Sequence, residues 1–174
     1  DATYLELPRR TGGQVFITTC SESGETLANL MQPLVRNDVH LILQANLDLP
    51  ANGTTAQIIP IDDTVHHAVF SVGMISKGNI VLRRPDGTAV QGNEAGVTVT
   101  DTIGSKTFTV ETPEVGNWRI DVTGTGVALI TASAATSTFL HKFEFVTVAG
   151  RAEHQGLFQI DGSPITGKNH TVRA

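Results

Sequence analysis

The chain has 174 residues, of which 40% are hydrophobic and 17% charged, so it can fold as a globular domain with a buried core. Its formal net charge of −5, without any cluster of lysine and arginine, argues against a nucleic-acid partner. No apolar run reaches the length of about 18 residues that a membrane-spanning helix needs, so no membrane span is predicted.

The first 37 residues predict one strand and one helix. Residues 15–19 are β-branched or aromatic, which favours a strand. Residues 21–36 predict a helix. Their apolar residues have helical spacing and form one stripe, made of Leu27, Leu30, Met31, Leu34 and Val35. Pro33 should kink or end this helix. The stripe must be buried against something, so we expect the helix to pack on the rest of the protein.

Cys20, between this strand and this helix, is the only cysteine of the chain. An internal disulfide is therefore impossible. Cys20 is either a small residue at a strand end or one half of an intermolecular disulfide, as a leftover cysteine of a secreted protein allows.

From residue 38 onward the sequence predicts strands alone. Apolar or alternating runs recur about every dozen positions, separated by glycine, proline, aspartate and asparagine. The predicted strands are 39–49, 57–61, 65–72, 79–84, 97–101, 106–111, 117–124, 127–134, 139–148 and 157–160. Without helices between them they indicate an antiparallel β-sandwich over residues 38–174, with residues 1–37 as an appended strand and helix.

Alternation within the strands identifies the residues of the predicted core. Trp118, Ile120 and Val122 alternate with polar residues and share one face. In the same way Phe143 and Phe145 share a face of a later strand. We expect both sets to be buried.

Two stretches resemble a known extracellular family. YLELPRRTGGQVFITT and the helix after it resemble the last strand and last helix of a von Willebrand factor A domain. IIPIDDTVHHAVFSVGMISKGNIVLRRPDGTAV and TFTVETPEVGNWRIDVTGTG resemble the β-sandwich that follows this A domain in hemicentin-like extracellular proteins. The tail LFQIDGSPITGKNHTV fits the connector to a further module.

The resemblance implies a secreted protein and a jelly-roll-like sandwich of the galactose-binding-domain type. That name describes a shape, and many such domains bind no sugar. The Asp-x-Ser-x-Ser loop that begins the metal site of an A domain is absent from the chain. The metal-dependent adhesion of A domains therefore cannot be transferred to any residue here.

The sequence does not predict an enzyme. It has no Gly-x-Ser-x-Gly turn, no Gly-x-Gly-x-x-Gly or Walker loop, and no indicated pair of convergent carboxylates. Its six histidines lack zinc-site spacing. The adjacent His66 and His67 should point to opposite faces of a strand, so they cannot both bind one ion.

Calcium is the candidate cofactor, because it prefers several oxygen ligands from loops. The residues considered for it are Asp62, Asp63 and Asp101, at the edges of predicted loops. The alternative is that these carboxylates are solvated turn residues. Two sequons, at Asn52 in a predicted exposed loop and at Asn169, are candidates for N-glycosylation.

The leading hypothesis is an extracellular, non-enzymatic recognition module that binds glycans or glycoproteins as a lectin, with or without calcium. Loop carboxylates, amides and flat polar rings would bind sugar hydroxyls, and the candidates are His66, His67, Asp86, Asn93 and Glu94. A homo-oligomer would add avidity. The alternative is a structural or adhesion module of a larger extracellular protein without sugar binding.

Overall fold

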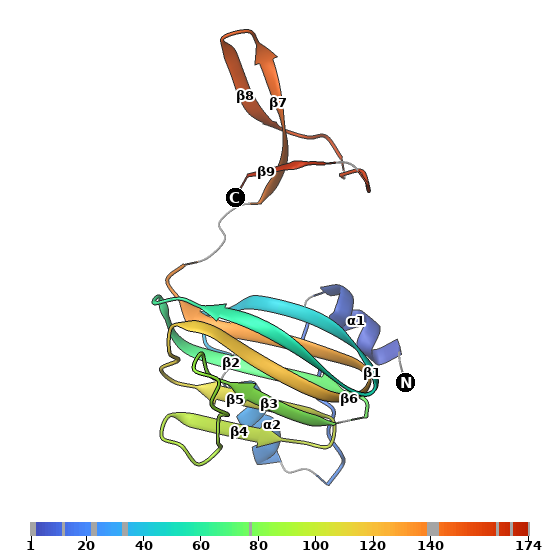
Figure 1. Cartoon of the computed structure of the whole chain (residues 1–174), viewed down its shortest axis with the longest axis vertical. Helices are drawn as coiled ribbons and strands as arrows, with labels where there is room; N and C mark the ends of the chain where they lie inside the picture. Colours follow the sequence, from blue (N-terminus) through green and yellow to red (C-terminus); the bar gives the residue numbers. More distant parts are fainter. Residues whose placement is uncertain are drawn as a thin grey trace. The chain divides into compact units, whose positions relative to one another are not determined.

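The computed structural model describes residues 3–11, 13–21, 24–32, 35–76, 78–138, 143–162, 164–167 and 169–173. Its elements are α1 (Thr3–Thr11), α2 (Gly24–Met31), β1 (Val39–Ile61), β2 (Val65–Met74), β3 (Asn79–Arg83), β4 (Val97–Asp101), β5 (Ser105–Val110), β6 (Gly116–Thr136), β7 (Glu144–Arg151), β8 (His154–Gln159) and β9 (Thr171–Arg173) (Figure 1). The predicted class is confirmed, since the fold is mostly β with antiparallel sheets and two short helices, consistent with a β-sandwich. Neither helix of the described ranges could cross a membrane.

The chain divides into two compact units, Asp1–Ser137 and Thr138–Ala174. The sequence instead placed one boundary after residue 37 and continued the sandwich to residue 174. The structure joins the N-terminal residues to the sandwich and separates the last three strands from it. Each unit has its own sheet: β1-β6-β2-β5-β4 with β3 beside β6 in the first, and β8-β7-β9 in the second.

Two long strands, β1 and β6, organise the first unit (Figure 1). The C-terminal part of β6 pairs with β2, whereas its N-terminal part pairs with β3. The predicted loop after residue 49 is a register shift within β1 between Leu49 and Gly53, because β6 continues unbroken opposite it. Pro50 and Pro60 are tolerated because β1 pairs with β6 alone and is therefore an edge strand.

The core of the first unit lies between the β2 side and the β3 side of this bent sheet. Phe70 of β2 and Trp118 of β6 are fully or almost fully buried and stack, with ring centroids 5.3 Å apart. Ile120 and Val122 are buried with Trp118, so the predicted core face of this strand is confirmed. The indole Nε1 of Trp118 donates to the carbonyl of Glu114 at 2.8 Å, which satisfies its buried donor.

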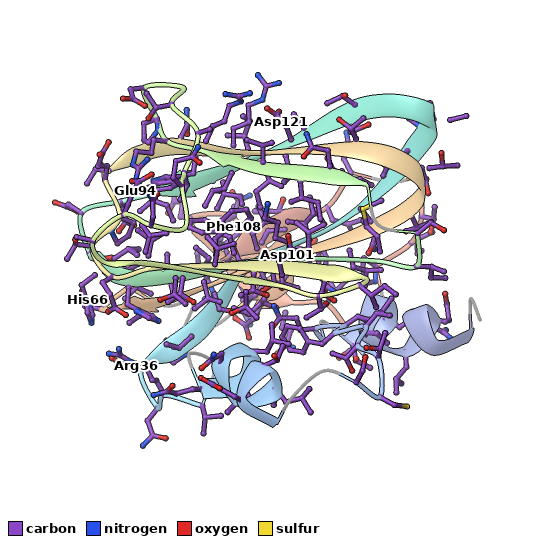
Figure 2. The ribbon with its side chains drawn as sticks, turned by 90° about the horizontal axis from the view of Figure 1, so that it is seen from below. Arg36, His66, Glu94, Asp101, Phe108 and Asp121 are labelled. Atoms are coloured by element: carbon purple, nitrogen blue, oxygen red, sulfur yellow. The ribbon has the colours of Figure 1, made fainter. Side chains whose placement is uncertain are left out.

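The outer face of β2 and β5 is also buried, because the N-terminal residues cover it (Figure 2). Ile17 is tied there: its amide donates to Ser105 Oγ at 2.8 Å, and its carbonyl accepts from Thr102 Oγ1 at 2.8 Å. Residues 15–19, predicted as a strand, are instead an irregular connection. Two side-chain hydroxyls and one backbone amide, that of Gly104, which donates to the carbonyl of Ile17 at 3.3 Å, replace a strand partner. Residues 3–11 form α1, a helix that the sequence did not predict.

The helix predicted over 21–36 forms over Gly24–Met31, and Pro33 and Leu34 lie outside the described residues. Leu30 is its buried anchor. Leu27, Met31 and Val35 of the predicted stripe remain exposed, so the helix packs through a narrower face than its spacing suggested.

The second unit is a small sheet with little buried surface. Within it, Val146 and Glu144 are buried, and Arg173 of β9 pairs with Glu144 of β7. Phe143, just before β7, was predicted to be buried but is exposed, and Phe145 is only partly buried. The buried residues of β7 are instead Glu144 and Val146, on either side of Phe145. The ring of Phe143 contacts Phe145 edge-on, with centroids 5.4 Å apart.

Candidate functional site

One end of the sandwich gathers most of the predicted site residues. Three connections lie at this end: the turn from β1 to β2, the segment after β3, and the segment from β5 to β6. The strand register places them together, because Ile61 at the end of β1 lies opposite Gly116 at the start of β6, and Ala68 of β2 lies opposite Val110 at the end of β5. Arg36, His66 and Glu94 lie toward this end, and Asp101 lies away from it (Figure 2). Loops clustered at one end of a sandwich are a common place for binding sites.

His66 and His67 lie on opposite faces of β2, as predicted. His66 is exposed, and its Nε2 lies 3.7 Å from Asp38 Oδ2. His67 is 3% exposed, and its Nδ1 lies 3.2 Å from Glu111 Oε2. Within the described part of the chain, the buried Nε2 of His67 has no hydrogen-bond partner. His67 is therefore the histidine that warrants a functional explanation, since buried polar atoms are normally paired.

A cavity of about 260 Å³ adjoins His67. Three neighbouring strands supply one wall, because Thr98 of β4 pairs with Thr109 of β5, and Ala68 of β2 pairs with Val110. This register brings onto one face the side chains of His67, Thr98, Thr109 and Glu111. We call this set the strand wall.

The opposite side of the cavity comes from α2 and the residues after it. These are Asn29, Gln32 and Arg36. They are held over the strands because α2 packs against β4. The cavity thus presents two amides, two hydroxyls, one guanidinium, one imidazole and one carboxylate, which can together donate and accept many hydrogen bonds.

An ion pair fixes the position of Arg36 at this cavity. Its Nε and Nη2 donate to the two carboxylate oxygens of Asp38 at 3.1 and 3.0 Å. These hydrogen bonds lower the pKa of Asp38 from 3.8 to about 2, and they raise the pKa of Arg36. Two parallel N–H···O bonds of this kind orient a guanidinium more firmly than a single contact would.

Three predicted sugar ligands, Asp86, Asn93 and Glu94, lie away from the cavity wall. Glu94 accepts from the amide of Gln91 at 2.6 Å and pairs with Arg84, and both contacts lower its pKa. Asp86 accepts from the amide of Thr88 at 2.8 Å, which lowers the pKa of Asp86. These two carboxylates stabilise the turns after β3, whereas Asn93 is exposed.

The three predicted calcium ligands do not converge on one ion. Asp62 accepts from the amide and the hydroxyl of Thr64 at 2.9 and 2.6 Å, and these bonds lower its pKa. Asp63 is exposed beside it. In the register of the sheet, Asp101 of β4 lies opposite Lys106 of β5, and Lys106 lies opposite Val72 of β2. Val72 is seven residues after Val65, where β2 begins. At about 3.3 Å per residue, Asp101 therefore lies roughly 23 Å along the sheet from the start of β2.

No group of three or more His, Cys, Asp or Glu side chains that could hold a metal occurs in the described ranges. Of the remaining candidates, Cys20 is exposed and forms no disulfide within the chain. Asn169 is exposed just before β9. Asn52 lies at the register shift of β1, not in a loop, and its side chain is outside the described residues.

Most of the cavity residues were not predicted from the sequence. His67 is the only one shared with the predicted set. One signal was present: Thr107, Thr109 and Glu111 alternate with the apolar Phe108 and Val110, which marks a polar face. An isolated polar face usually indicates solvent, and only the covering helix turns it into a cavity wall. Asn29 and Gln32 gave no signal beyond lying on the polar side of the helix.

Comparison with known proteins does not assign the chain. No family model matches it, and no curated protein matches it. The likeness to hemicentin-like proteins thus rests on the motifs quoted above.

Proposed function

We propose that the protein is an extracellular, non-enzymatic recognition module that binds carbohydrate in the cavity between α2 and the strand wall. The observation that carries the proposal is the cavity's lining, since the seven described residues that line it all have polar side chains. Sugar hydroxyls both donate and accept hydrogen bonds, and amides, hydroxyls and charged planar groups are suited to both roles. The strand wall supplies a rigid part of the site, because its side chains come from paired strands.

The size of the cavity favours one sugar unit at a time. Sites for larger ligands usually exceed about 300 Å³, and this one has about 260 Å³. Among the described residues, its lining includes no aromatic ring on which a sugar could stack. Binding would then depend on hydrogen bonds, which favours modest affinity for a single site and a gain from multivalent display.

Calcium stays a candidate cofactor of this proposal. Glu111 is the one carboxylate among the described residues that line the cavity, so an ion bound by these residues would need oxygen atoms from the sugar itself and from solvent. Each binding measurement is therefore made with calcium and with a chelator.

The test is binding of the full chain to a glycan array, followed by titration of the best monosaccharides by NMR. Thr109→Val removes a cavity hydroxyl at nearly constant volume and should weaken binding about tenfold, the effect of roughly 1.4 kcal/mol. Thr100→Val is the control on the neighbouring strand β4, since Thr100 is not among the residues that line the cavity. If the chain binds no glycan on the array, either with calcium or with a chelator, the lectin proposal is wrong.

A second candidate is a structural or adhesion module, which the small sheet of the second unit favours. Val148 and Leu157 are cross-strand neighbours and both are exposed, and Phe158 is exposed on the other face. The outer strands β8 and β9 each pair with β7 alone. An identical edge from a second copy could extend this sheet and cover the apolar side chains.

Light scattering at two protein concentrations tests self-association. Leu157→Lys should shift a concentration-dependent dimer toward monomer. Gln155→Lys adds the same charge on the same strand face and should leave the dimer intact. A wild-type monomer at both concentrations would contradict this second candidate.

A further inference from the structure

The charges at the cavity favour one class of sugar, on the premise that the cavity is the carbohydrate site proposed above. Glu111 is the one carboxylate among the described residues that line it. The side chain of Glu111 is 57% exposed, so a ligand in the cavity can reach it. Its Oε2 lies 3.2 Å from Nδ1 of His67. A carboxylate offers roughly four positions for hydrogen bonds, so most of this capacity stays available to a ligand.

The negative charge of Glu111 is poorly compensated by its neighbours. A neutral imidazole such as that of His67 donates a hydrogen bond but brings no positive charge. Arg36 is the cation among the described lining residues, and its Nε and Nη2 donate to both carboxylate oxygens of Asp38. Asp38 accordingly raises the pKa of Arg36 more than Glu111 does. With one cation for two carboxylates, this group of side chains attracts a positively charged ligand.

The other side chains of the lining suit the hydroxyls of a sugar ring. Asn29 and Gln32 come from α2 and the residue after it, and Thr98 and Thr109 come from β4 and β5. Amides and hydroxyls both donate and accept hydrogen bonds. A ligand that satisfies the whole lining therefore has several hydroxyls and one ammonium group. An ammonium group donates up to three hydrogen bonds, and those to a carboxylate are strengthened by charge.

We propose that the cavity takes amino sugars, such as glucosamine, and that Glu111 binds their ammonium group. Glu111 then determines specificity, and the amide and hydroxyl side chains bind the remaining hydroxyls of the ring. N-acetylation removes the positive charge, so an N-acetylated sugar loses this advantage. The preference is modest, because the side chain of Glu111 is half-exposed and water screens its charge.

The first measurement compares three sugars with the full chain. The probes are the methyl glycosides of glucosamine, N-acetylglucosamine and glucose, which differ at one position of the ring. At about pH 7 the amino group is largely protonated. Titration followed by ¹H–¹⁵N NMR should give an affinity about fivefold higher for the glucosamine glycoside than for the other two. Added salt should reduce this preference, because it screens the charge of Glu111.

Two variants test whether Glu111 is the source of the preference. Glu111→Gln keeps the size of the side chain and removes its charge, so the three affinities should become equal within about twofold. Glu114→Gln is the matched control, because the side chain of Glu114 is 61% exposed and Glu114 is not among the described residues that line the cavity. It removes the same charge near the same end of the sandwich and should keep the preference. The ratio of affinities is measured within each variant, so a loss of stability does not imitate a loss of preference.

The outcomes distinguish this inference from the proposed function. Equal affinities of the three glycosides for the wild-type chain, or a preference that persists in Glu111→Gln, would overturn the inference and leave a carbohydrate site. Butylammonium, which resembles the end of a lysine side chain, tests the charge without the sugar. If it binds as tightly as the glucosamine glycoside, the inference is also wrong. If none of the three glycosides binds, both the inference and the carbohydrate site fail.

Discussion

Phe70 and Trp118 stack across the core of the first unit, with ring centroids 5.3 Å apart and ring planes inclined by 20°. The two rings connect β2 to the N-terminal part of β6, which otherwise pairs with β1 and β3. Their contact therefore joins the two sides of the bent sheet on which the cavity's strand wall is built.

Replacing Phe70 with alanine should reduce the free energy of unfolding by about 3–5 kcal/mol, because a buried ring is lost and a cavity remains. Urea denaturation followed by the fluorescence of Trp118, the only tryptophan, measures the change. Ile58→Ala is the control in the same unit, since Ile58 of β1 is 46% exposed, and it should cost less than about 1 kcal/mol. Equal losses for the two variants would contradict the assignment of the core.

The cover formed by the N-terminal residues depends on a close approach at Gly104. A Cβ atom at this position would lie 2.5 Å from Cβ of Ile17 and 2.8 Å from the carbonyl oxygen of Met74. Gly104→Ala should therefore displace the segment around Ile17 and accelerate its cleavage in limited proteolysis. Gly24→Ala, where a Cβ atom meets nothing within 4 Å, is the matched control. Unchanged cleavage in Gly104→Ala would show that the segment is not held there.

The fold class and the core could be predicted because they depend on local patterns. The alternation around Trp118 and Ile120 fixes which side of a strand is buried, whatever the strand pairs with. The same reasoning failed for Phe143, because alternation identifies an apolar face without telling whether a second layer covers it. The joining of two predicted strands into β1 was also missed, since turn residues such as Pro50 can equally form a bulge opposite a continuous partner.

The candidate site depended on contacts between distant parts of the chain. His67 and Glu111 are 44 residues apart in sequence and meet through the pairing of β2 with β5. The cavity also requires α2 to pack on β4, which no local pattern specifies. Asp62 and Asp86 were chosen as ligands because they are carboxylates near turns, and each instead bonds to a threonine two residues later.

The pair of Arg36 and Asp38 makes stability depend on acidity in a defined range. The folded protein lowers the pKa of Asp38 from 3.8 to about 2. The unfolded chain then takes up the proton first as the pH falls, so this stabilisation is complete above about pH 4 and is lost toward pH 2. Carboxyl ¹³C NMR should show Asp38 titrating near 2, and in Arg36→Gln it should titrate closer to 3.8. Titration of Asp38 near 3.8 in the wild-type protein would contradict the ion pair.

The second unit provides a separate test at Glu144 and Arg173. Glu144 is 6% exposed, and Nε of Arg173 donates to its Oε2 at 3.1 Å, so the pair attaches β9 to β7. Arg173→Gln removes this ion pair with the buried carboxylate and should weaken the attachment by about 1–3 kcal/mol. Hydrogen exchange should then show faster exchange at the amides of β9 than at those of β8.

Arg151→Gln is the control for this variant, because Arg151 lies exposed at the end of β7 and its replacement removes the same charge. It should leave the exchange of β9 unchanged. Since β8 pairs with the opposite edge of β7, its protection should survive in both variants. If Arg173→Gln instead lowers the protection of β8 and β9 together, the three strands open as one cooperative unit. That outcome would contradict the prediction that the ion pair acts on β9 alone.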